Sequence, residues 1–513
     1  MDFDTVMLKN LGKLIDDSKD ANAVALIDCL TQQPRIFSHG QIDRLADSCA
    51  RGLIERGLQA GDAVAILSIN RAEFLVAYYA IMRAGMIAVP VNHKLSADGV
   101  AFILSDCSAK LAFVDQDRAA LVPGDLPAVR LDNEEWEAFL NPGSFETFEP
   151  APRTCAMILY TSGSTGRPKG VQLSHDGQLW ALAVRTSARA SFDDERLIVA
   201  APLFHMNALA SCKFALCAHA SVVLMPQFDA KSFIGALGQH GVTWITSVPT
   251  MMAMLVRETA ALASIDTSRV RYVRMGSAPA TQQLYDAVLR VFPHAAAAGG
   301  YGTTEAGPIV FGPTKDKPLP GGDGLGWPMK EVEVRIADAN GNDAKEGELW
   351  MRTPANMLGY LNMPEKTAQV LTDDGWYKSG DAFRTDEQGC YYFVGRVDDM
   401  FNCGGENIYP GEVESVIEQM PAVLQSCVVP VPDEIKGQKP VAFVVPKQDT
   451  GLTEQAVKDY VLAHAPAYQH PRRVYFLDAL PLAATNKVDR RYLVEVAARS
   501  PGNGLPADTA GSK

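Results

Sequence analysis

The sequence predicts an α/β fold with a second, smaller domain, and three observations along its 513 residues support this. Apolar, strand-like runs alternate with helical stretches from residue 40 to residue 275, as in parallel sheets with crossover helices. After residue 320 the pattern changes to one typical of antiparallel hairpins. A compact α+β unit follows Asp398, so we place the domains at 1–397 and 398–500.

The first elements follow from the spacing of apolar residues. Helical spacing predicts a helix within 40–60, and the short apolar run 63–68 predicts a buried strand. The same reasoning gives a helix over 71–83, a strand over 86–91, and another helix and strand within 96–114. Further buried strands are expected at 221–225, 242–247 and 270–275.

The later elements are assigned in the same way. Two segments around the turn Asn340-Gly341 alternate apolar and polar residues and predict a hairpin, at 331–336 and 347–352. In the small domain we expect helices at 410–420 and 454–463, with strands at 425–431 and 440–446. The segment 501–513 is rich in Pro, Gly, Ser and Ala, which predicts a disordered tail.

Composition excludes several classes of protein. With 47% hydrophobic and 21% charged residues, the chain is neither disordered, collagen-like nor a small disulfide scaffold. A formal charge of −13 argues against nucleic acid as a partner. Nine scattered cysteines without a C-x-x-C pair indicate reduced thiols, and we expect a cytoplasmic protein. The N-terminus lacks signal-peptide features, and the most apolar window, 74–91, is too interrupted to be an integral membrane segment.

The segment 158–170 predicts a phosphate-binding loop. Glycines let backbone N–H groups converge on an anion, hydroxyls add donors, and Lys169 adds a charge. The loop is not a Walker loop, because no Gly-Lys is followed by Ser or Thr. The candidate nucleotide contacts are Thr161, Ser162, Gly163, Ser164, Thr165 and Gly166.

This string resembles the signature loop of the adenylate-forming superfamily, which includes acyl-CoA synthetases, luciferases and peptide-synthetase adenylation domains. Four further segments match the superfamily's motifs in the same order, so the resemblance covers nearly the whole chain. It implies a large N-terminal domain of α/β subdomains plus a β-barrel-like subdomain, and a small mobile C-terminal domain. It also implies that ATP, Mg²⁺ and coenzyme A take part in the reaction.

The second motif is Gly299–Pro308. Tyr301 offers a flat face for a purine, Thr304 can donate to a phosphate oxygen, and Glu305 is a hard oxygen ligand for Mg²⁺. The resemblance assigns the same roles and places a second segment over the other face of adenine. The candidate nucleotide contacts in these two segments are Gly300, Tyr301, Gly302, Thr303, Ser277, Ala278 and Pro279.

Four later motif residues complete the nucleotide site and the hinge. Asp381 carries a carboxylate that can accept hydrogen bonds from both ribose hydroxyls, and the resemblance puts Arg396 beside it. In similar enzymes, the residue at the position of Asp398 is the hinge of the small domain. Lys487 matches the catalytic lysine that bridges the attacking carboxylate and the α-phosphate. The family usually has Gly before this lysine, whereas this chain has Asn486.

The resemblance also suggests where coenzyme A binds. Gly404 and Gly405 add no side-chain bulk, and relatives use this segment to line a pantetheine tunnel. Candidate contacts for the nucleotide of coenzyme A are Tyr468, His470, Arg472, Arg473 and Lys94. This basic cluster is equally consistent with a solvated face.

The acid pocket is expected beside 202–207, where His205 stands at the position of aromatic gate residues in relatives. No Asp lies between Phe204 and Leu209, which argues against an amino acid, and the small residues at 295–300 leave room for a flat or extended acid. We therefore expect an ATP-dependent acid:CoA ligase acting on an aromatic, cinnamic-type or medium-chain acid. A stand-alone adenylation enzyme that loads a carrier protein and an inactive nucleotide-binding sensor are the alternatives, and a homodimer is left open.

Overall fold

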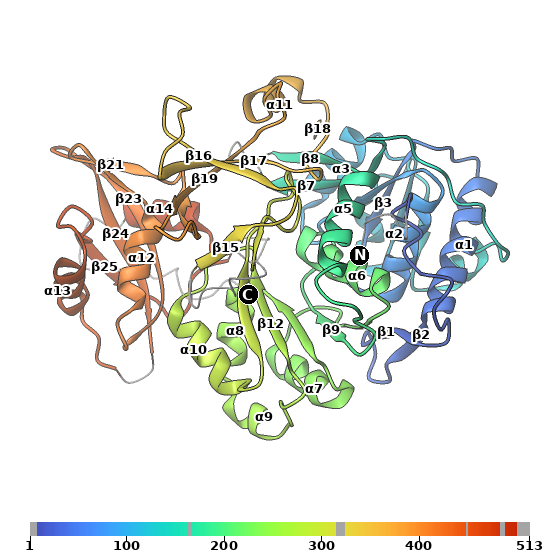
Figure 1. Cartoon of the computed structure of the whole chain (residues 1–513), viewed down its shortest axis with the longest axis horizontal. Coiled ribbons are helices and arrows are strands. Elements are labelled where there is room, and N and C mark those ends of the chain that lie inside the picture. Colours follow the sequence, from blue (N-terminus) through green and yellow to red (C-terminus); the bar gives the residue numbers. More distant parts are fainter. Residues whose placement is uncertain (1–7, 163–166, 314–323, 448–449, 483–487, 500–513) are drawn as a thin grey trace.

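The protein has a large N-terminal domain and a small C-terminal domain, as the computed structural model shows (Figure 1). The structure describes residues 8–162, 167–313, 324–447, 450–482 and 488–499. The expected tail at 501–513 lies outside this range. Two α/β sheets and one antiparallel sheet form the large domain, and a fourth sheet with three helices forms the small one.

The first α/β sheet has seven strands in the order β13-β12-β11-β9-β10-β1-β2. All neighbouring pairs are parallel except β1 with β2, and the expected strands at 221–225, 242–247 and 270–275 are confirmed as β10, β11 and β12. The strands are β1 (Val24–Asp28), β2 (Arg35–Ser38), β9 (Arg196–Val199), β10 (Ser221–Leu224), β11 (Trp244–Ser247), β12 (Tyr272–Gly276) and β13 (Ala296–Gly300).

The second α/β sheet has seven strands in the order β18-β8-β7-β4-β3-β5-β6. The pairs β7–β8 and β8–β18 are antiparallel, so the phosphate motif lies at a hairpin. Lys169 therefore lies on the strand β8. The sequence analysis had placed it inside the loop, and that prediction was wrong. The strands are β3 (Ala63–Leu67), β4 (Ile87–Pro90), β5 (Leu111–Val114), β6 (Ala128–Arg130), β7 (Cys155–Ser162), β8 (Pro168–Ser174) and β18 (Gly359–Tyr360).

Helices cover both α/β sheets, and one helix, α2, is completely buried. Every residue of α2 is buried, which fits its apolar sequence. α1 begins at a capping box formed by Ser38 and Gln41, which explains its start one residue before the expected range. The helices are α1 (His39–Glu55), α2 (Ala72–Arg83), α3 (Ala97–Asp106), α4 (Glu134–Phe139), α5 (His175–Thr186), α6 (Met206–Cys217), α7 (Ala230–His240), α8 (Pro249–Leu255), α9 (Thr259–Ala263), α10 (Gln282–Val291) and the 3₁₀ helix η1 (Gln116–Leu121).

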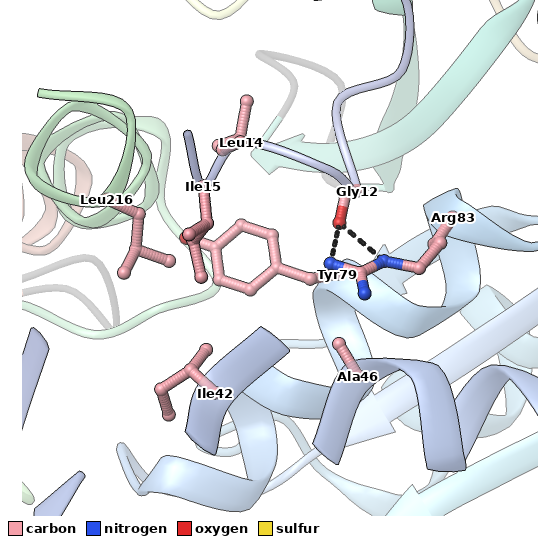
Figure 2. Close-up of a pocket in the computed structure, with 8 residues that line it drawn as sticks. All are labelled: Gly12, Leu14, Ile15, Ile42, Ala46, Tyr79, Arg83 and Leu216. Carbon is pink, nitrogen blue, oxygen red and sulfur yellow. Dashed lines mark hydrogen bonds between the residues drawn. The ribbon is translucent and has the colours of Figure 1, made fainter. Parts of the chain in front are cut away.

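Near the N-terminus, a small apolar pocket joins the segment before β1 to α1, α2 and α6 (Figure 2). The Arg83 guanidinium donates to the carbonyl oxygen of Gly12 at 2.8 and 3.0 Å, and it also pairs with Asp43 and Asp47 on α1. Since these bonds satisfy the buried charge, the pocket is part of the structural core.

The third sheet is antiparallel, with the order β14-β15-β20-β19-β17-β16, and confirms the expected hairpin as β16 and β17. It forms the subdomain that was expected to be β-barrel-like, and it lies between the α/β sheets and the small domain (Figure 1). Its elements are β14 (Phe311–Gly312), β15 (Gly324–Pro328), β16 (Glu333–Ala337), β17 (Glu346–Arg352), β19 (Tyr377–Thr385), β20 (Tyr391–Arg396) and the helix α11 (Pro364–Val370).

The small domain has its own cores, built from buried residues between Phe401 and Ala497, whereas the buried cores of the large domain end at Phe383. The four expected elements of this domain are confirmed as α12, α13, β23 and β24. In the described part of the chain no helix is both long and apolar enough to cross a membrane. The elements are β21 (Phe401–Cys403), β22 (Glu406–Ile408), α12 (Pro410–Glu418), β23 (Val423–Asp433), β24 (Gly437–Pro446), α13 (Glu454–His464), β25 (Arg473–Phe476) and α14 (Arg490–Arg499).

Candidate active site

Lys169 and Glu305 are connected through a tyrosine that the sequence analysis did not single out. The Tyr360 hydroxyl donates to Glu305 Oε1 at 3.0 Å and accepts from Lys169 Nζ at 3.4 Å. The same ammonium lies 4.5 Å from the centre of the Tyr360 ring. Burial lowers the pKa of Lys169, and the Glu305 carboxylate opposes that shift. The two residues from separate motifs are thus held at one place by a buried hydroxyl.

The position of Tyr360 follows from short strand pairing. β18 has only two residues, and Tyr360 pairs with Val171 on β8, two positions along that strand from Lys169. Glu305 is fixed from the other side, because its backbone oxygen accepts a hydrogen bond of 2.7 Å from the Met357 amide. Burial, and then the Glu305 carboxylate, raise the pKa of Tyr360, so its hydroxyl stays protonated at neutral pH.

A second connected group contains Asp381 and Tyr301. Asp381 is only 6% exposed and accepts hydrogen bonds from the Tyr301 hydroxyl at 2.5 Å and from Arg396 at 2.7 Å. The Tyr301 ring packs edge-on against Phe383, with 4.8 Å between ring centres. Burial and the neighbouring carboxylate raise the pKa of Tyr301. Each carboxylate oxygen has two lone pairs, so Asp381 can accept further hydrogen bonds from a ligand.

Arg396 connects this group to the expected hinge. Its guanidinium lies between Asp381 and Asp398, and the Nη2 atom is 3.4 Å from Asp398 Oδ2. Burial alone would lower the pKa of Arg396, but the two carboxylates outweigh burial and raise it. The pair Arg396–Asp398 is partly exposed, so Coulombic attraction contributes little stability here.

The remaining nucleotide candidates lie around the carboxyl ends of β12 and β13. Gly300 ends β13, and the turn that follows is closed by a 3.1 Å hydrogen bond from the Thr303 amide to the Gly307 oxygen. Gly302 and Thr304 belong to this turn and are half-buried. After β12, Ser277 has a left-handed φ of 69° and begins an exposed segment with Ala278 and Pro279. The structure thus brings these two segments to one edge of the sheet.

The phosphate motif is only partly described. Thr161 and Ser162 end β7, and the Thr161 hydroxyl is buried without a hydrogen-bond partner among the described residues. Gly163, Ser164, Thr165, Gly166 and Lys487 lie outside the described residues. An unpartnered hydroxyl beside Lys169 fits a motif that binds an anionic ligand.

The candidate acid pocket lies at the start of α6. His205 is its N-cap residue, and its ring centre is 4.3 Å from that of Phe204. Asn207 lies close to Gly276, where an added Cβ would be 3.9 Å from the Asn207 amide nitrogen and 3.6 Å from the Gly300 oxygen. The start of α6 therefore faces the ends of β12 and β13.

In the small domain, Gly404 and Gly405 form the two-residue turn between β21 and β22 with φ values of 66° and 98°. An added Cβ would meet nothing within 4 Å at Gly405 and only the Lys436 side chain, at 3.6 Å, at Gly404. In this structure the turn requires glycine for its positive φ and not for close packing.

Four of the other expected coenzyme A contacts lie in the small domain, and the fifth, Lys94, lies in the large domain. Tyr468 packs against the core of the small domain, and His470 Nδ1 lies 2.6 Å from Arg472. Arg473 begins β25 in the small domain, whereas Lys94 lies between β4 and α3 in the large domain.

The chemistry of the site fits a magnesium–nucleotide complex. Mg²⁺ is usually held in such complexes by one or two carboxylates together with phosphates and water, so Glu305 alone suffices on the protein side. No group of three or more His, Cys, Asp or Glu residues is placed to hold a metal in the described ranges.

Comparisons with known proteins agree with this geometry. Residues 16–361 match the AMP-binding enzyme family, and residues 412–487 match the AMP-binding enzyme C-terminal domain. A 3-[(3aS,4S,7aS)-7a-methyl-1,5-dioxo-octahydro-1H-inden-4-yl]propanoyl:CoA ligase of Mycobacterium tuberculosis is 32% identical over 91% of this chain and 95% of its own. A feruloyl-CoA synthase of an Amycolatopsis species is 32% identical over 88% and 92%.

Solved structures lead to the same family. The anthranilate CoA ligase AuaEII in complex with anthranoyl-AMP is similar, with a TM-score of 0.87, 26% identity, and coverage of 97% of this chain and 99% of that one. The family models match both domains, and the solved structure is similar to this chain over nearly its full length. This chain belongs to the AMP-binding enzyme family, the adenylate-forming enzymes.

Proposed function

We propose that this protein joins a carboxylic acid to coenzyme A in two half-reactions, with an aromatic, cinnamic-type or medium-chain acid as substrate. In the first, a carboxylate oxygen attacks the α-phosphorus of ATP, and the bond to pyrophosphate breaks. In the second, the coenzyme A thiol attacks the acyl carbon, so that AMP leaves and a thioester forms. The observation that carries the proposal is the connection of Lys169 and Glu305, from two separate motifs, through the hydroxyl of Tyr360.

Each residue has a role in the first half-reaction. Asp381 accepts from the ribose hydroxyls while Arg396 and Tyr301 hold its carboxylate in place. Tyr301 also stacks on the adenine, opposite 277–279. Lys169, Thr304 and the loop at 161–166 donate to the phosphates. Glu305 would hold Mg²⁺, which when bound neutralises phosphate charge. Lys487 stabilises the charge that develops between the carboxylate and the α-phosphate.

The second half-reaction requires Lys487 to leave and the thiol to enter. A hinge at the boundary between 1–397 and 398–500 would permit this, and Asp398 is the residue we assign to it. The Arg396–Asp398 contact is exposed and weak, so a rotation there costs little. Gly404 and Gly405 then face the pantetheine arm, and Tyr468 and His470 face its nucleotide.

The similarity to two relatives supports an aromatic or cyclic acid as the substrate. One relative is named for feruloyl-CoA and the other for a bicyclic propanoyl acid, and the similar solved structure holds anthranoyl-AMP. His205 borders the pocket for such an acid. We also place the enzyme in the cytoplasm, since all nine cysteines are free thiols in the structure.

Pyrophosphate release with a panel of carboxylic acids, with and without coenzyme A, tests the proposal. We expect rapid turnover only when acid, MgATP and coenzyme A are all present, and a thioester as product. An enzyme that loads a carrier protein would release pyrophosphate but form no coenzyme A thioester. A sensor without activity would bind ATP and release no pyrophosphate with any acid.

A further inference from the structure

Three cations lie between the first α/β sheet and helices α5 and α6, and the reaction described above does not use them. Arg274 stands on β12 opposite Ala298 of β13. It shares a face of the sheet with Gly276, which lies next to Asn207 of α6. Arg185 of α5 and Lys213 of α6 form the rest of the group. We call these three residues the cation cluster.

Arg274 borders the candidate acid pocket. Its guanidinium donates to the Pro308 oxygen at 3.1 Å, and an added Cβ on Gly300 would lie only 2.6 Å from its Nε atom. Glycine at position 300 therefore makes room for the guanidinium. Arg274 contacts both ends of the loop 300–308, whose middle carries Thr304 and Glu305, and its side chain stays partly exposed.

The other two cations are buried, and they lie close to Pro308, the residue to which Arg274 donates. Arg185 donates to the Ala210 oxygen at 3.1 Å, and its guanidinium carbon is 4.2 Å from the centre of the Phe214 ring. Lys213 is 1% exposed and donates to Gln178 Oε1 at 2.8 Å. The buried Gln178 Nε2 atom has no hydrogen-bond partner among the described residues, so this amide has a donor available to a ligand.

Among the residues that the structure describes, no carboxylate balances the cation cluster. Within the described ranges, none of the three residues forms an ion pair, in contrast to Arg83, which has two. Burial lowers the pKa of Arg274 and of Arg185, and burial with the nearby Arg185 lowers that of Lys213 to about 7. Uncompensated charges in a protein interior cost stability, so such a cluster needs a compensating anion or a functional reason.

We propose that the cation cluster binds a second carboxylate of the acid substrate, at the end remote from the reacting one, with Arg274 in direct contact. The inference rests on the proposed function and narrows its substrate class to dicarboxylic acids of aromatic or medium-chain type. The planar guanidinium offers paired donors to a carboxylate, and Lys213 and Arg185 add positive potential nearby. Asn207 lies near Gly276, on the same face of the sheet as Arg274, and would be a further polar contact for this carboxylate.

Matched acids test the proposal directly: octanedioate against octanoate, and 4-carboxycinnamate against cinnamate. Binding to the whole protein is measured by calorimetry without ATP, and turnover by pyrophosphate release. We expect the diacid of at least one pair to bind about tenfold more tightly or better, as for a charge-assisted, bidentate contact. Tighter binding of both monoacids than of the diacids would overturn the proposal.

Variants separate a binding role from a structural one. Arg274→Met should abolish the preference for the diacid without lowering the melting temperature, because it removes an uncompensated charge; Arg274→Lys should keep part of the preference. Arg290→Met, at an exposed position of α10, is the control and should keep the full preference. If Arg274→Met does not fold, Lys213→Met carries the same expectation.

The two proposals can fail separately. If no acid releases pyrophosphate, the ligase activity is wrong, yet calorimetry still decides whether diacids are preferred. If monoacids are turned over and an intact Arg274→Met variant keeps the wild-type selectivity, the ligase stands and the second-carboxylate site is wrong.

Discussion

Removing the Tyr360 hydroxyl tests the connection between Lys169 and Glu305. Tyr360→Phe leaves the ring, its packing and the cation–π contact at 4.5 Å, and deletes the hydrogen bonds of 3.0 Å to Glu305 and 3.4 Å from Lys169. A hydrogen bond to a charged group contributes about 1.5–3 kcal/mol. Since the 3.4 Å contact is long, we count only the bond to Glu305, which corresponds to a loss of about 10- to 150-fold in kcat/KM for MgATP.

Pyrophosphate release at saturating acid and varied MgATP measures this effect. Tyr79→Phe is the matched control, because the Tyr79 hydroxyl is buried without a hydrogen-bond partner in the described part of the chain (Figure 2). We expect the control to match the wild type. A folded Tyr360→Phe enzyme with kcat/KM within twofold of the wild type would refute the view that this hydroxyl organises the site.

Three further predictions concern the small domain. Lys487→Ala should abolish adenylation yet spare thioester formation from supplied acyl-adenylate, and equal loss of both half-reactions would refute its assigned role. Asp398→Pro should do the reverse, because a fixed φ restricts the hinge; unchanged thioester formation would remove that argument. Burial, followed by the Glu414 carboxylate, raises the pKa of Glu418 from 4.5 to about 8, so the folded state holds a proton that the unfolded state releases between these pH values. The stability of the small domain should therefore fall as the pH rises from about 4.5 to 8. Urea unfolding of Glu418→Gln should show a flatter pH dependence, whereas Glu495→Gln, at an exposed position, should behave as the wild type.

The sequence predicted those helices and strands whose pattern of apolar residues lies within a single segment. Strands such as β3 and β10 are short apolar runs, and helices such as α2 and α13 have clear boundaries, so their residues identify them without tertiary information. The motif residues Lys169, Glu305 and Asp381 were found because their chemistry and order are distinctive.

Other features depend on contacts between distant segments. Tyr360 belongs to a strand of two residues, which has no periodicity to detect, and it meets Glu305 only through the pairing of β18 with β8. The cation cluster unites Arg185, Lys213 and Arg274 from two helices and a strand, each of which looks like an ordinary surface cation in the sequence. Lys169 was expected in a loop because β8 begins at a proline, which usually marks a break.

The fate of the carboxylate oxygen tests the central claim most directly. In the proposed route, the acid's oxygen bonds to the α-phosphorus and stays there when the thiol attacks the acyl carbon. An acid labelled with ¹⁸O in both carboxylate positions should therefore yield AMP with one labelled oxygen per thioester, as read by mass spectrometry. Thioester formation with unlabelled AMP, or with the label in orthophosphate beside ADP, would contradict adenylate formation at this site.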